Sequence, residues 1–219
     1  MNFRFVELQQ GTPAWRAWRQ EGVGASDAAS IMGVSPYATL AQVFAEKMVH
    51  QERPQTFAMR RGNRLEPVAR EMFTRQTGIP VRPVCVENLQ YPWLRASLDG
   101  WRSKGAVILE IKAPNIGDHG YACEGLVPVH YRPQLVHQCL ATGADEVFYA
   151  SYSEHSAVPA EKRLCIVRYV PTAEELGTLL DLEEKFWAEV EAFRLREIGS
   201  DAVPHGDDLF NEPNIAVMR

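Results

Sequence analysis

The fold is decided by a stretch near the middle of the chain, Leu98-Asp99-Gly100-Trp101-Arg102-Ser103-Lys104-Gly105-Ala106-Val107-Ile108-Leu109-Glu110-Ile111-Lys112. Residues 94–101 and 106–112 are rich in β-forming side chains, and the Ser-Lys-Gly segment between them is typical of a hairpin tip. Alternate residues of a strand point to the same face, so Glu110 and Lys112 are predicted to project together while their neighbours enter the core. The hairpin brings Asp99 within reach of the same place.

Two carboxylates and an ammonium group in one place suggest a metal-dependent reaction. Magnesium and other hard cations prefer carboxylate, carbonyl and water oxygens. Asp99, Glu110 and the carbonyl of Ile111 are therefore the expected ligands. Lys112 is expected to orient or deprotonate a water molecule that the metal acidifies. Glu-x-Lys is also a common sequence, and its alternative interpretation is an exposed strand edge with a surface salt bridge.

Helices and strands are predicted on both sides of this hairpin from periodicity and capping residues. Helices are expected at residues 26–32, 39–49, 61–77, 130–142 and 172–198, and further strands at 81–87, 147–152 and 164–170. Ser26 is expected to cap the first helix, and Pro67 to kink the third or to delay its start until about Glu66. Together, these helices and strands predict an α+β or mixed α/β domain, with a central mixed sheet flanked by helices.

Length and composition suit one globular domain. The chain has 219 residues, of which 46% are hydrophobic and 23% charged, enough for a sizeable core. We expect a single domain over residues 1–219, with its core at about 15–170, and with the helix at 172–198 and a polar tail at 199–219 as appendages. No apolar run approaches the roughly 20 residues that cross a bilayer, and the N-terminus lacks the features of a signal peptide. These observations predict a cytoplasmic protein that does not associate with membranes.

Cysteine and histidine spacing gives no sign of a metal-binding motif. The four cysteines, Cys85, Cys123, Cys139 and Cys165, form no C-x-x-C pair. The six histidines likewise lack a spacing such as H-E-x-x-H. Reduced and mostly buried thiols are therefore the expected state of the cysteines.

Charge is distributed unevenly along the chain. The net charge is −5, yet arginines gather in the first third. Arg53 and Arg61, together with Arg60 and Arg64, are candidates for contacts with phosphate groups. The alternative is that these arginines form ordinary solvated surface.

Five sequence blocks occur in the order that is typical of one nuclease family. They are Trp15-Arg-Ala-Trp-Arg19 with Gly22-Val-Gly-Ala-Ser-Asp-Ala-Ala29, Arg61-Gly-Asn-Arg-Leu-Glu66, Ala96-Ser-Leu-Asp-Gly100, Leu109-Glu-Ile-Lys-Ala-Pro114, and Tyr131-Arg-Pro-Gln134 with His137-Gln138 and Ala141-Thr-Gly143. Through these blocks, spread over residues 15–152, the chain resembles the phage lambda exonuclease and YqaJ-type alkaline exonuclease family of PD-(D/E)xK nucleases.

The resemblance implies a fold, an activity and partners. The fold would be a restriction-endonuclease-like core. The activity would be Mg²⁺-dependent, processive 5′→3′ digestion of one strand of linear duplex DNA, with two ions in each site and Mn²⁺ as a substitute. The product would be a 3′ single strand for recombination by single-strand annealing. The implied partners are duplex DNA ends, two further copies of the chain in a homotrimeric ring, and a single-strand annealing protein.

The resemblance also implies roles for catalytic residues. Asp99 and Glu110 match the metal ligands, Lys112 matches the catalytic lysine, and Glu66 matches a helix glutamate that completes the acidic site. The alternative for Glu66 is a charge at a helix N-terminus that the dipole favours. The family pattern has Gln-x-Gln in the helix after the catalytic strand, where this chain has Gln134-Leu135-Val136. Whether Gln134 or Gln138 contacts the site is therefore left open.

A pocket for the 5′-phosphate of the DNA end is implied as well. Arg19, Ser26 and Ser97 match its residues in the family. Gly22 and Gly24 are expected to let the backbone approach a ligand closely, and a helix that starts at Ser26 would direct its N-terminus at the phosphate. In the alternative interpretation, Ser26 is only a helix cap.

Two other functions remain open on the same residues. The first is a structure-specific or restriction-like endonuclease, which would have no need of an end-binding pocket at Arg19 and Ser26. The second is a non-catalytic DNA-end-binding protein, which would have no need of an intact Asp99, Glu110 and Lys112.

Overall fold

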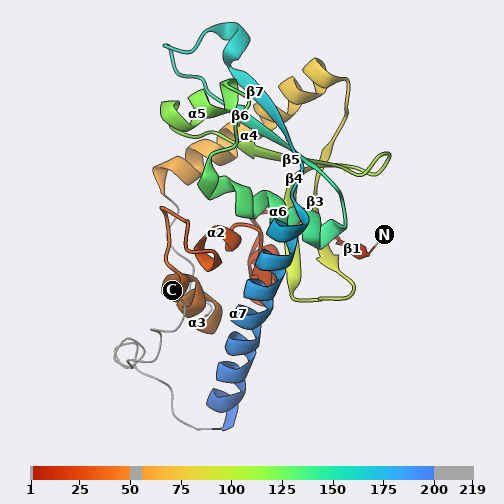
Figure 1. Cartoon of the computed structure of the whole chain (residues 1–219), viewed down its shortest axis with the longest axis vertical. Helices are drawn as coiled ribbons and strands as arrows, with labels where there is room; N and C mark the ends of the chain where they lie inside the picture. The colour runs from red at the N-terminus through yellow and green to blue at the C-terminus, as the bar shows by residue number, and fades with distance from the viewer. Residues whose placement is uncertain (1, 50–55, 200–219) are drawn as a thin grey trace.

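The computed structural model describes residues 2–49 and 56–199, which fold around one twisted sheet (Figure 1). Its strands lie in the order β1 (Phe3–Val6), β3 (Arg82–Asn88), β4 (Leu94–Arg102), β5 (Val107–Lys112), β6 (Val147–Tyr152) and β7 (Leu164–Tyr169), and β2 (Val23–Gly24) pairs with β4. The β5–β6 and β2–β4 pairs are parallel and the other pairs are antiparallel. The predicted central mixed sheet is confirmed.

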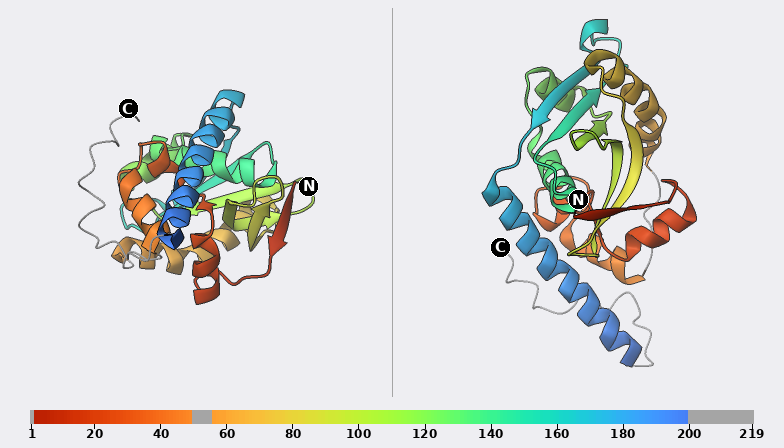
Figure 2. Two further views of the ribbon diagram at one scale, coloured as in Figure 1. Left: turned by 90° about the horizontal axis from the view of Figure 1, so that it is seen from below. Right: turned by 90° about the vertical axis from the view of Figure 1, so that its right-hand side faces the viewer.

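Helices cover both faces of the sheet. They are α1 (Pro13–Gln20), α2 (Ala28–Ile31), α3 (Leu40–Val49), α4 (Phe57–Thr77), α5 (Ile116–Cys123), α6 (Arg132–Thr142) and α7 (Ala173–Gly199), with single 3₁₀ turns η1 (Val129–Tyr131) and η2 (Ala160–Lys162). On one face, α6 buries Leu135 and Cys139 against β3, β4 and β6. On the other face, α4 buries Leu65 and Phe73 against β5 and β6. The sheet therefore lies between α4 and α6, and α7 runs past α6 and projects beyond the sheet (Figures 1 and 2).

The sheet divides along one edge of β4. On this edge, Gly100–Arg102 pair with β5, whereas Leu94 and Arg95 pair with the two residues of β2. The other edge of β4 pairs with β3. Residues 96–99 of β4 thus lie between two partner strands, and β4 and β5 separate from each other immediately before Gly100. This opening positions the candidate site.

Most predicted elements are found within one or two residues of their expected bounds. The structure also contains β1, β2, α1 and α5, which the sequence patterns did not predict. The first predicted helix is shorter than expected, because α2 begins at Ala28 with Asp27 in the N-cap position, and Ser26 is not its cap. The third predicted helix starts earlier than expected, because Thr56 caps α4 by accepting a hydrogen bond from the N–H of Met59, and Pro67 lies well inside it. The predicted polar tail at 199–219 falls almost wholly outside the described residues.

The expectation of four reduced thiols is wrong for two of them. Cys123 at the end of α5 and Cys165 in β7 form a disulfide, with a Cα–Cα distance of 5.1 Å. They are 42 residues apart in sequence, and the packing of α5 against β7 brings them together. Cys85 and Cys139 are free and buried, as expected. Among the described helices, none has both the length and the apolar character required to cross a membrane.

Candidate active site

The predicted acidic residues meet at the opening between β4 and β5. One carboxylate oxygen of Asp99 accepts a hydrogen bond of 2.7 Å from the backbone N–H of Ile111. Glu110 and Lys112 lie on the same side of β5, with Lys112 Nζ 2.6 Å from Glu110 Oε1. Because β5 is an inner strand of the sheet, the alternative of an exposed edge with a surface salt bridge is wrong. Next to Asp99, a Cβ at Gly100 would lie 2.8 Å from a methyl group of Val81 and 3.0 Å from Leu109 Cβ, so close packing favours glycine at this position of β4.

Both candidate glutamines contact the site. Gln134 Nε2 donates a hydrogen bond of 2.6 Å to Glu110 Oε1, and Gln138 Nε2 donates one of 2.5 Å to Oε2. The two glutamines are four residues apart on α6 and therefore share a helix face. Val136 faces the opposite way and packs against Ala28 of α2. The question left open by the sequence is thus resolved, because the two amides together hold both oxygens of one carboxylate.

Glu66 joins this group from the helix on the other face of the sheet. It lies in the middle of α4, so its interpretation as a charge at a helix N-terminus is wrong. Arg70, one turn later, pairs with the Glu66 carboxylate and also donates from Nε to the backbone carbonyl of Asp99 at 2.6 Å. Arg70 thereby connects the acidic helix to the acidic strand.

Burial and mutual repulsion govern the charges of these residues. Burial raises the pKa of Asp99 well above its usual range, and the negative charges of Glu110 and Glu66 add to the effect. Burial also raises the pKa of Glu66, which the pairing with Arg70 only partly offsets. For Lys112, burial alone would lower the pKa, but the carboxylates of Glu110 and Asp99 together raise it above the usual value. In the metal-free cluster, these carboxylates favour the protonated form of Lys112.

The donor atoms fit a hard divalent cation. Asp99 and Glu110 supply anionic oxygens, and the backbone carbonyl of Ile111 lies on the same strand as Glu110. Burial raises the pKa of Asp99, and the negative charges of Glu110 and Glu66 raise it further, so the metal-free cluster disfavours its full negative charge. A divalent cation would neutralise this charge, and an all-oxygen ligand set favours Mg²⁺ or Mn²⁺ over Zn²⁺.

Three residues of the site were not singled out from the sequence. Arg70 follows Glu66 by four positions, and this spacing was the available signal for its ion pair. Tyr131 lies beneath the ammonium group of Lys112, with Nζ 5.5 Å from the ring centroid, and its hydroxyl is 3.2 Å from that of Tyr37. A cation above an aromatic face depends on tertiary packing, so no sequence spacing reveals it.

Comparisons with known proteins decide the family. The model of the YqaJ-like viral recombinase domain matches residues 14–145 of this chain. The chain belongs to this family. No curated protein sequence matches it.

Solved structures agree with the YqaJ-like assignment. An alkaline exonuclease from Laribacter hongkongensis is 26% identical, with a TM-score of 0.74 over 87% of this chain and 100% of that one. The same enzyme in complex with dAMP is 24% identical, with a TM-score of 0.70 over the same shares. A phage-related exonuclease from Haemophilus somnus is 12% identical, with a TM-score of 0.58 over 83% of this chain and 96% of that one, and shares the fold. This YqaJ-like chain is therefore an enzyme of the nuclease type.

The residues that match the family's phosphate pocket lie together in this YqaJ-like structure. Arg19 Nη2 donates a hydrogen bond of 2.6 Å to the exposed hydroxyl of Ser26, and the Arg19 guanidinium lies 4.7 Å from the ring centroid of Trp15. Trp15 Nε1 donates in turn to Ser97 Oγ at 2.7 Å. Ser97 and Asp99 are two residues apart on β4, so they share a face of that strand at a spacing of about 7 Å.

Two expectations about this pocket are wrong. A four-residue α2 that begins after Ser26 does not direct a helix N-terminus from that serine. Gly22 approaches the chain's own backbone instead of a ligand, because a Cβ there would lie 2.3 Å from the carbonyl oxygen of Trp93. At Gly24 a Cβ would meet Asp27 and Arg19 only at ordinary contact distance.

The arginines proposed for phosphate contacts differ in their surroundings. Arg53 lies outside the described residues. Arg61 donates to the backbone carbonyls of Ala113, at 3.1 Å, and Pro114, at 3.4 Å, directly after Lys112. Together with Glu154, three arginines of α4 line a hollow of about 500 Å³; the lining residues are Phe57, Arg60, Arg61, Arg64 and Glu154.

Proposed function

We propose that this protein is a Mg²⁺-dependent exonuclease that digests one strand of duplex DNA from its 5′ end and leaves a 3′ single strand. The observation that carries the proposal is that one residue from each of two groups lies on β4. Asp99, which meets Glu110 and Lys112 of β5, lies on β4 where this strand separates from β5. Ser97, which is joined to Arg19 and Ser26 through Trp15, lies two residues earlier on β4.

Asp99, Glu110 and the carbonyl of Ile111 would hold Mg²⁺, or Mn²⁺ in its place, and Glu66 would complete a two-ion site. The bound metal would supply an acidified water molecule and neutralise charge on the scissile phosphate. Gln134 and Gln138 keep the Glu110 carboxylate in one orientation, because each amide holds a different oxygen. Arg70 keeps Glu66 beside Asp99.

Lys112 would act as a positioned cation. Its pKa is raised by Glu110 and Asp99, so it donates hydrogen bonds and carries positive charge at neutral pH. Of the two roles expected for it, orientation of the attacking water and of the phosphate fits this protonation state better than removal of a proton. The Tyr131 ring beneath the ammonium group limits the directions in which it can point.

The pocket at Arg19 would select DNA ends. A terminal phosphate carries more charge than a phosphodiester, and a guanidinium group binds it through two charge-assisted hydrogen bonds. Serine hydroxyl groups from Ser26 and Ser97 add neutral donors.

A digestion experiment tests this function. Purified full-length protein is incubated with a linear duplex and with a covalently closed circle of the same sequence, each with Mg²⁺ or with EDTA. We expect mononucleotides from the linear duplex with Mg²⁺ only, and an intact circle. Cleavage of the circle would instead indicate the structure-specific or restriction-like endonuclease, and binding without cleavage would indicate a non-catalytic end-binding protein.

Partners are proposed on the family resemblance. We infer a homotrimeric ring around DNA, and an annealing protein that receives the 3′ single strand. Light scattering of the purified protein would then report three times the 24.7 kDa mass of one chain.

A further inference from the structure

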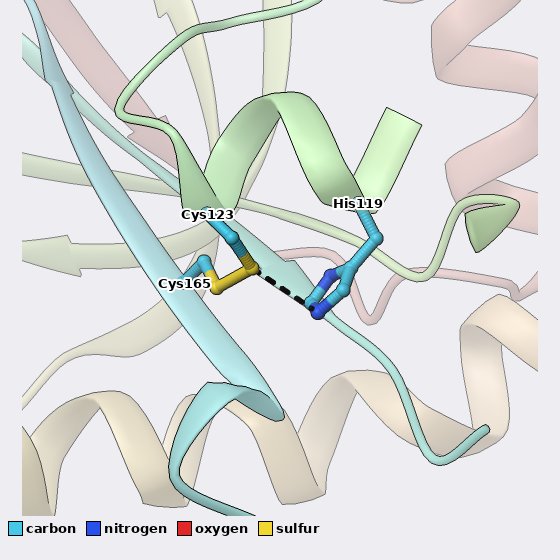
Figure 3. A group of neighbouring side chains, drawn as sticks. All are labelled: His119, Cys123 and Cys165. Carbon is cyan, nitrogen blue, oxygen red and sulfur yellow. Dashed lines mark hydrogen bonds between the residues drawn. A yellow bond between two sulfur atoms is a disulfide. The ribbon is translucent and has the colours of Figure 1, made fainter. Parts of the chain in front are cut away.

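A second group of side chains with metal-ligating atoms lies on α5 and β7 (Figure 3). His119 is buried, and Cys123 and Cys165 are half-buried. Their three ligand atoms, one nitrogen and two sulfurs, all lie within 4.8 Å of one another. None of these residues contributes to the proposed nuclease reaction.

Local structure brings four donor atoms to one point. His119 and Cys123 are four residues apart on α5 and therefore share a helix face. The carbonyl oxygen of Lys162, at the end of η2, lies 2.9 Å from His119 Nε2, 3.3 Å from Cys165 Sγ and 3.8 Å from Cys123 Sγ. One nitrogen, two sulfurs and one oxygen thus come from three elements.

In the structure this group is in its oxidised form. Cys123 and Cys165 are joined by a disulfide, and His119 Nε2 donates its hydrogen bond to the Lys162 carbonyl. On the other side of the ring, Nδ1 lies 2.8 Å from the hydroxyl of Ser151. Reduction by a dithiol transfers two electrons and two protons to the two sulfurs, and the dithiol is converted to its own disulfide.

We propose that the reduced pair, Cys123 and Cys165, binds Zn²⁺ together with His119 and the Lys162 carbonyl. Zinc takes four ligands in a tetrahedron, with bonds of about 2.3 Å to sulfur and 2.0 Å to nitrogen. In this geometry a sulfur ligand and a nitrogen ligand lie about 3.5 Å apart. Cys123 Sγ already lies 3.5 Å from His119 Nε2 (Figure 3). Metal binding releases the two thiol protons and moves the ring proton to Nδ1, which then donates a hydrogen bond to Ser151 Oγ.

Ser151 completes the argument, because a histidine ligand is usually oriented by a hydrogen bond from its second ring nitrogen. Its hydroxyl is buried and faces Nδ1. Ser151 is also the β6 residue that pairs with Lys112 of β5. The disulfide and the zinc form would therefore both tie α5 to β7, one strand away from the nuclease lysine.

Cobalt substitution tests the proposal directly. The full chain is reduced with a phosphine, freed of metal and titrated with CoCl₂, because only thiolate ligands give a sulfur-to-cobalt charge-transfer band. We expect one Co²⁺ per chain with this band and with the visible bands of tetrahedral cobalt, and displacement by ZnCl₂. Protein oxidised with diamide should give neither the charge-transfer band nor the visible bands of tetrahedral cobalt. The Cys165→Ser variant should lose the charge-transfer band, and Cys139→Ser, at a buried free cysteine, should keep it.

Binding at the nuclease site is distinguished by the same spectrum. That site offers oxygen ligands only, so a Glu110→Gln variant should keep the sulfur-to-cobalt band at full intensity. Absence of the band from reduced wild-type protein, or its persistence in Cys165→Ser, would overturn the proposal.

A second measurement covers the case in which Cys165→Ser fails to fold. Reduced wild-type protein is alkylated with iodoacetamide in the presence or absence of ZnCl₂, and each cysteine is quantified by mass spectrometry. Zinc should protect Cys123 and Cys165 by at least about tenfold in rate and leave Cys85 and Cys139 unchanged. Equal alkylation of Cys123 with and without zinc would contradict the site.

Discussion

At the scale of single residues, Glu110 is the most constrained side chain of the site. Only 2% of it is exposed, and its two oxygens contact Gln134, Gln138 and Lys112. A buried carboxylate is stable only when its hydrogen-bonding capacity is met. These contacts fix its position before any cation binds, which is the condition for a precise metal site.

The first prediction concerns the two carboxylates. Asp99→Ala and Glu110→Ala should each abolish Mg²⁺-dependent cleavage, because one of two anionic ligands is lost. Asp99→Ala should also leave the metal-free protein folded and at least as stable, since the raised pKa of Asp99 shows that its charge opposes folding at neutral pH. Thermal unfolding with EDTA and digestion with Mg²⁺ measure the two effects. Digestion at the wild-type rate by Asp99→Ala would remove the metal assignment.

The second prediction concerns Lys112. Lys112→Gln keeps the length of the side chain and loses its charge, so the cleavage rate should fall by at least about 10²-fold. DNA affinity, measured with Ca²⁺ in place of Mg²⁺, should change little. If affinity collapsed and the rate per bound complex stayed normal, Lys112 would be a phosphate contact.

Residue identities were predictable where chemistry limits the choice. Asp99, Glu110 and Lys112 follow from strand alternation and a hairpin, and the structure brings them together. Gln138 could not be chosen over Gln134, because either fits the helix face and only packing shows that both bind Glu110. The Cys123–Cys165 disulfide was missed because it joins elements whose contact depends on the fold, and the spacing of the cysteines carries no signal.

At the scale of elements, the separation of β4 from β5 creates the site, and α1 with the β2 segment supplies the pocket beside it. α1 presents Arg19 and Trp15 toward Ser26 and Ser97. In the proposed function, metal binding and end binding are therefore carried by neighbouring elements that meet on β4. A change in the pocket should alter the choice of DNA end without changing the metal site.

The third prediction follows from that arrangement. Wild-type protein should degrade a 5′-phosphorylated duplex faster than a 5′-hydroxyl duplex, and Arg19→Ala should remove most of this preference while keeping the Mg²⁺ requirement. Arg16→Ala is the matched control on the same helix, because its guanidinium donates to the Gly11 carbonyl instead. Equal wild-type rates on the two ends would exclude the pocket from the mechanism.

The fourth prediction concerns the support of the pocket. Asp27 Oδ2 lies 2.9 Å from Lys47 Nζ, with both side chains at least 90% buried, and Lys47 also donates to the Arg19 carbonyl at 3.0 Å. Asp27→Asn should lower the free energy of unfolding by about 3–5 kcal/mol, because it leaves a buried ammonium without its partner. The exposed pair of Glu71 and Arg75 is the control, and Glu71→Gln should change stability by about 1 kcal/mol or less.

The buried pair of Asp27 and Lys47 also predicts that the stability of the protein depends on pH. Burial raises the pKa of Asp27, but the positive charges of Lys47 and Arg19 more than offset this effect. The net result is a pKa below the unfolded value of 3.8. The stability that Asp27 contributes is therefore present above pH 3.8 and lost as the pH falls through the lower folded value. Urea unfolding between pH 2 and 5 should show this loss in wild-type protein and a weaker one in Asp27→Asn. Equal slopes in the two proteins would contradict the assignment.

Elements were predictable where their signal is local. The helices predicted from residues 39 and 172 begin with capping boxes, in which Thr39 pairs with Gln42 and Thr172 with Glu175, and this signal is read directly from the sequence. β1 and β2 are only four and two residues long, too short for a clear period. Ser26 appeared to be a cap because serine is a common N-cap residue, and its exposed hydroxyl instead pairs with Arg19.

At the scale of the whole molecule, a net charge of −5 is combined with a local group of arginines at one hollow on α4. DNA binding depends on local charge, so the overall acidity does not oppose it. The long helix α7 buries one face through Leu179, Phe186 and Val190, so it packs on the domain and is not merely an appendage. The single-domain organisation and the trimer remain predictions, because neither is visible in one chain.

The most direct test of 5′→3′ digestion uses one linear duplex, phosphorylated at both 5′ ends and labelled with one fluorophore near the 5′ end and another near the 3′ end of the same strand. Wild-type protein with Mg²⁺ should release the 5′ fluorophore first, as a labelled mononucleotide. The 3′ fluorophore should stay on a polymer strand until digestion has travelled the length of the duplex. Earlier release of the 3′ fluorophore, or release of either one on internal oligonucleotides, would contradict the account.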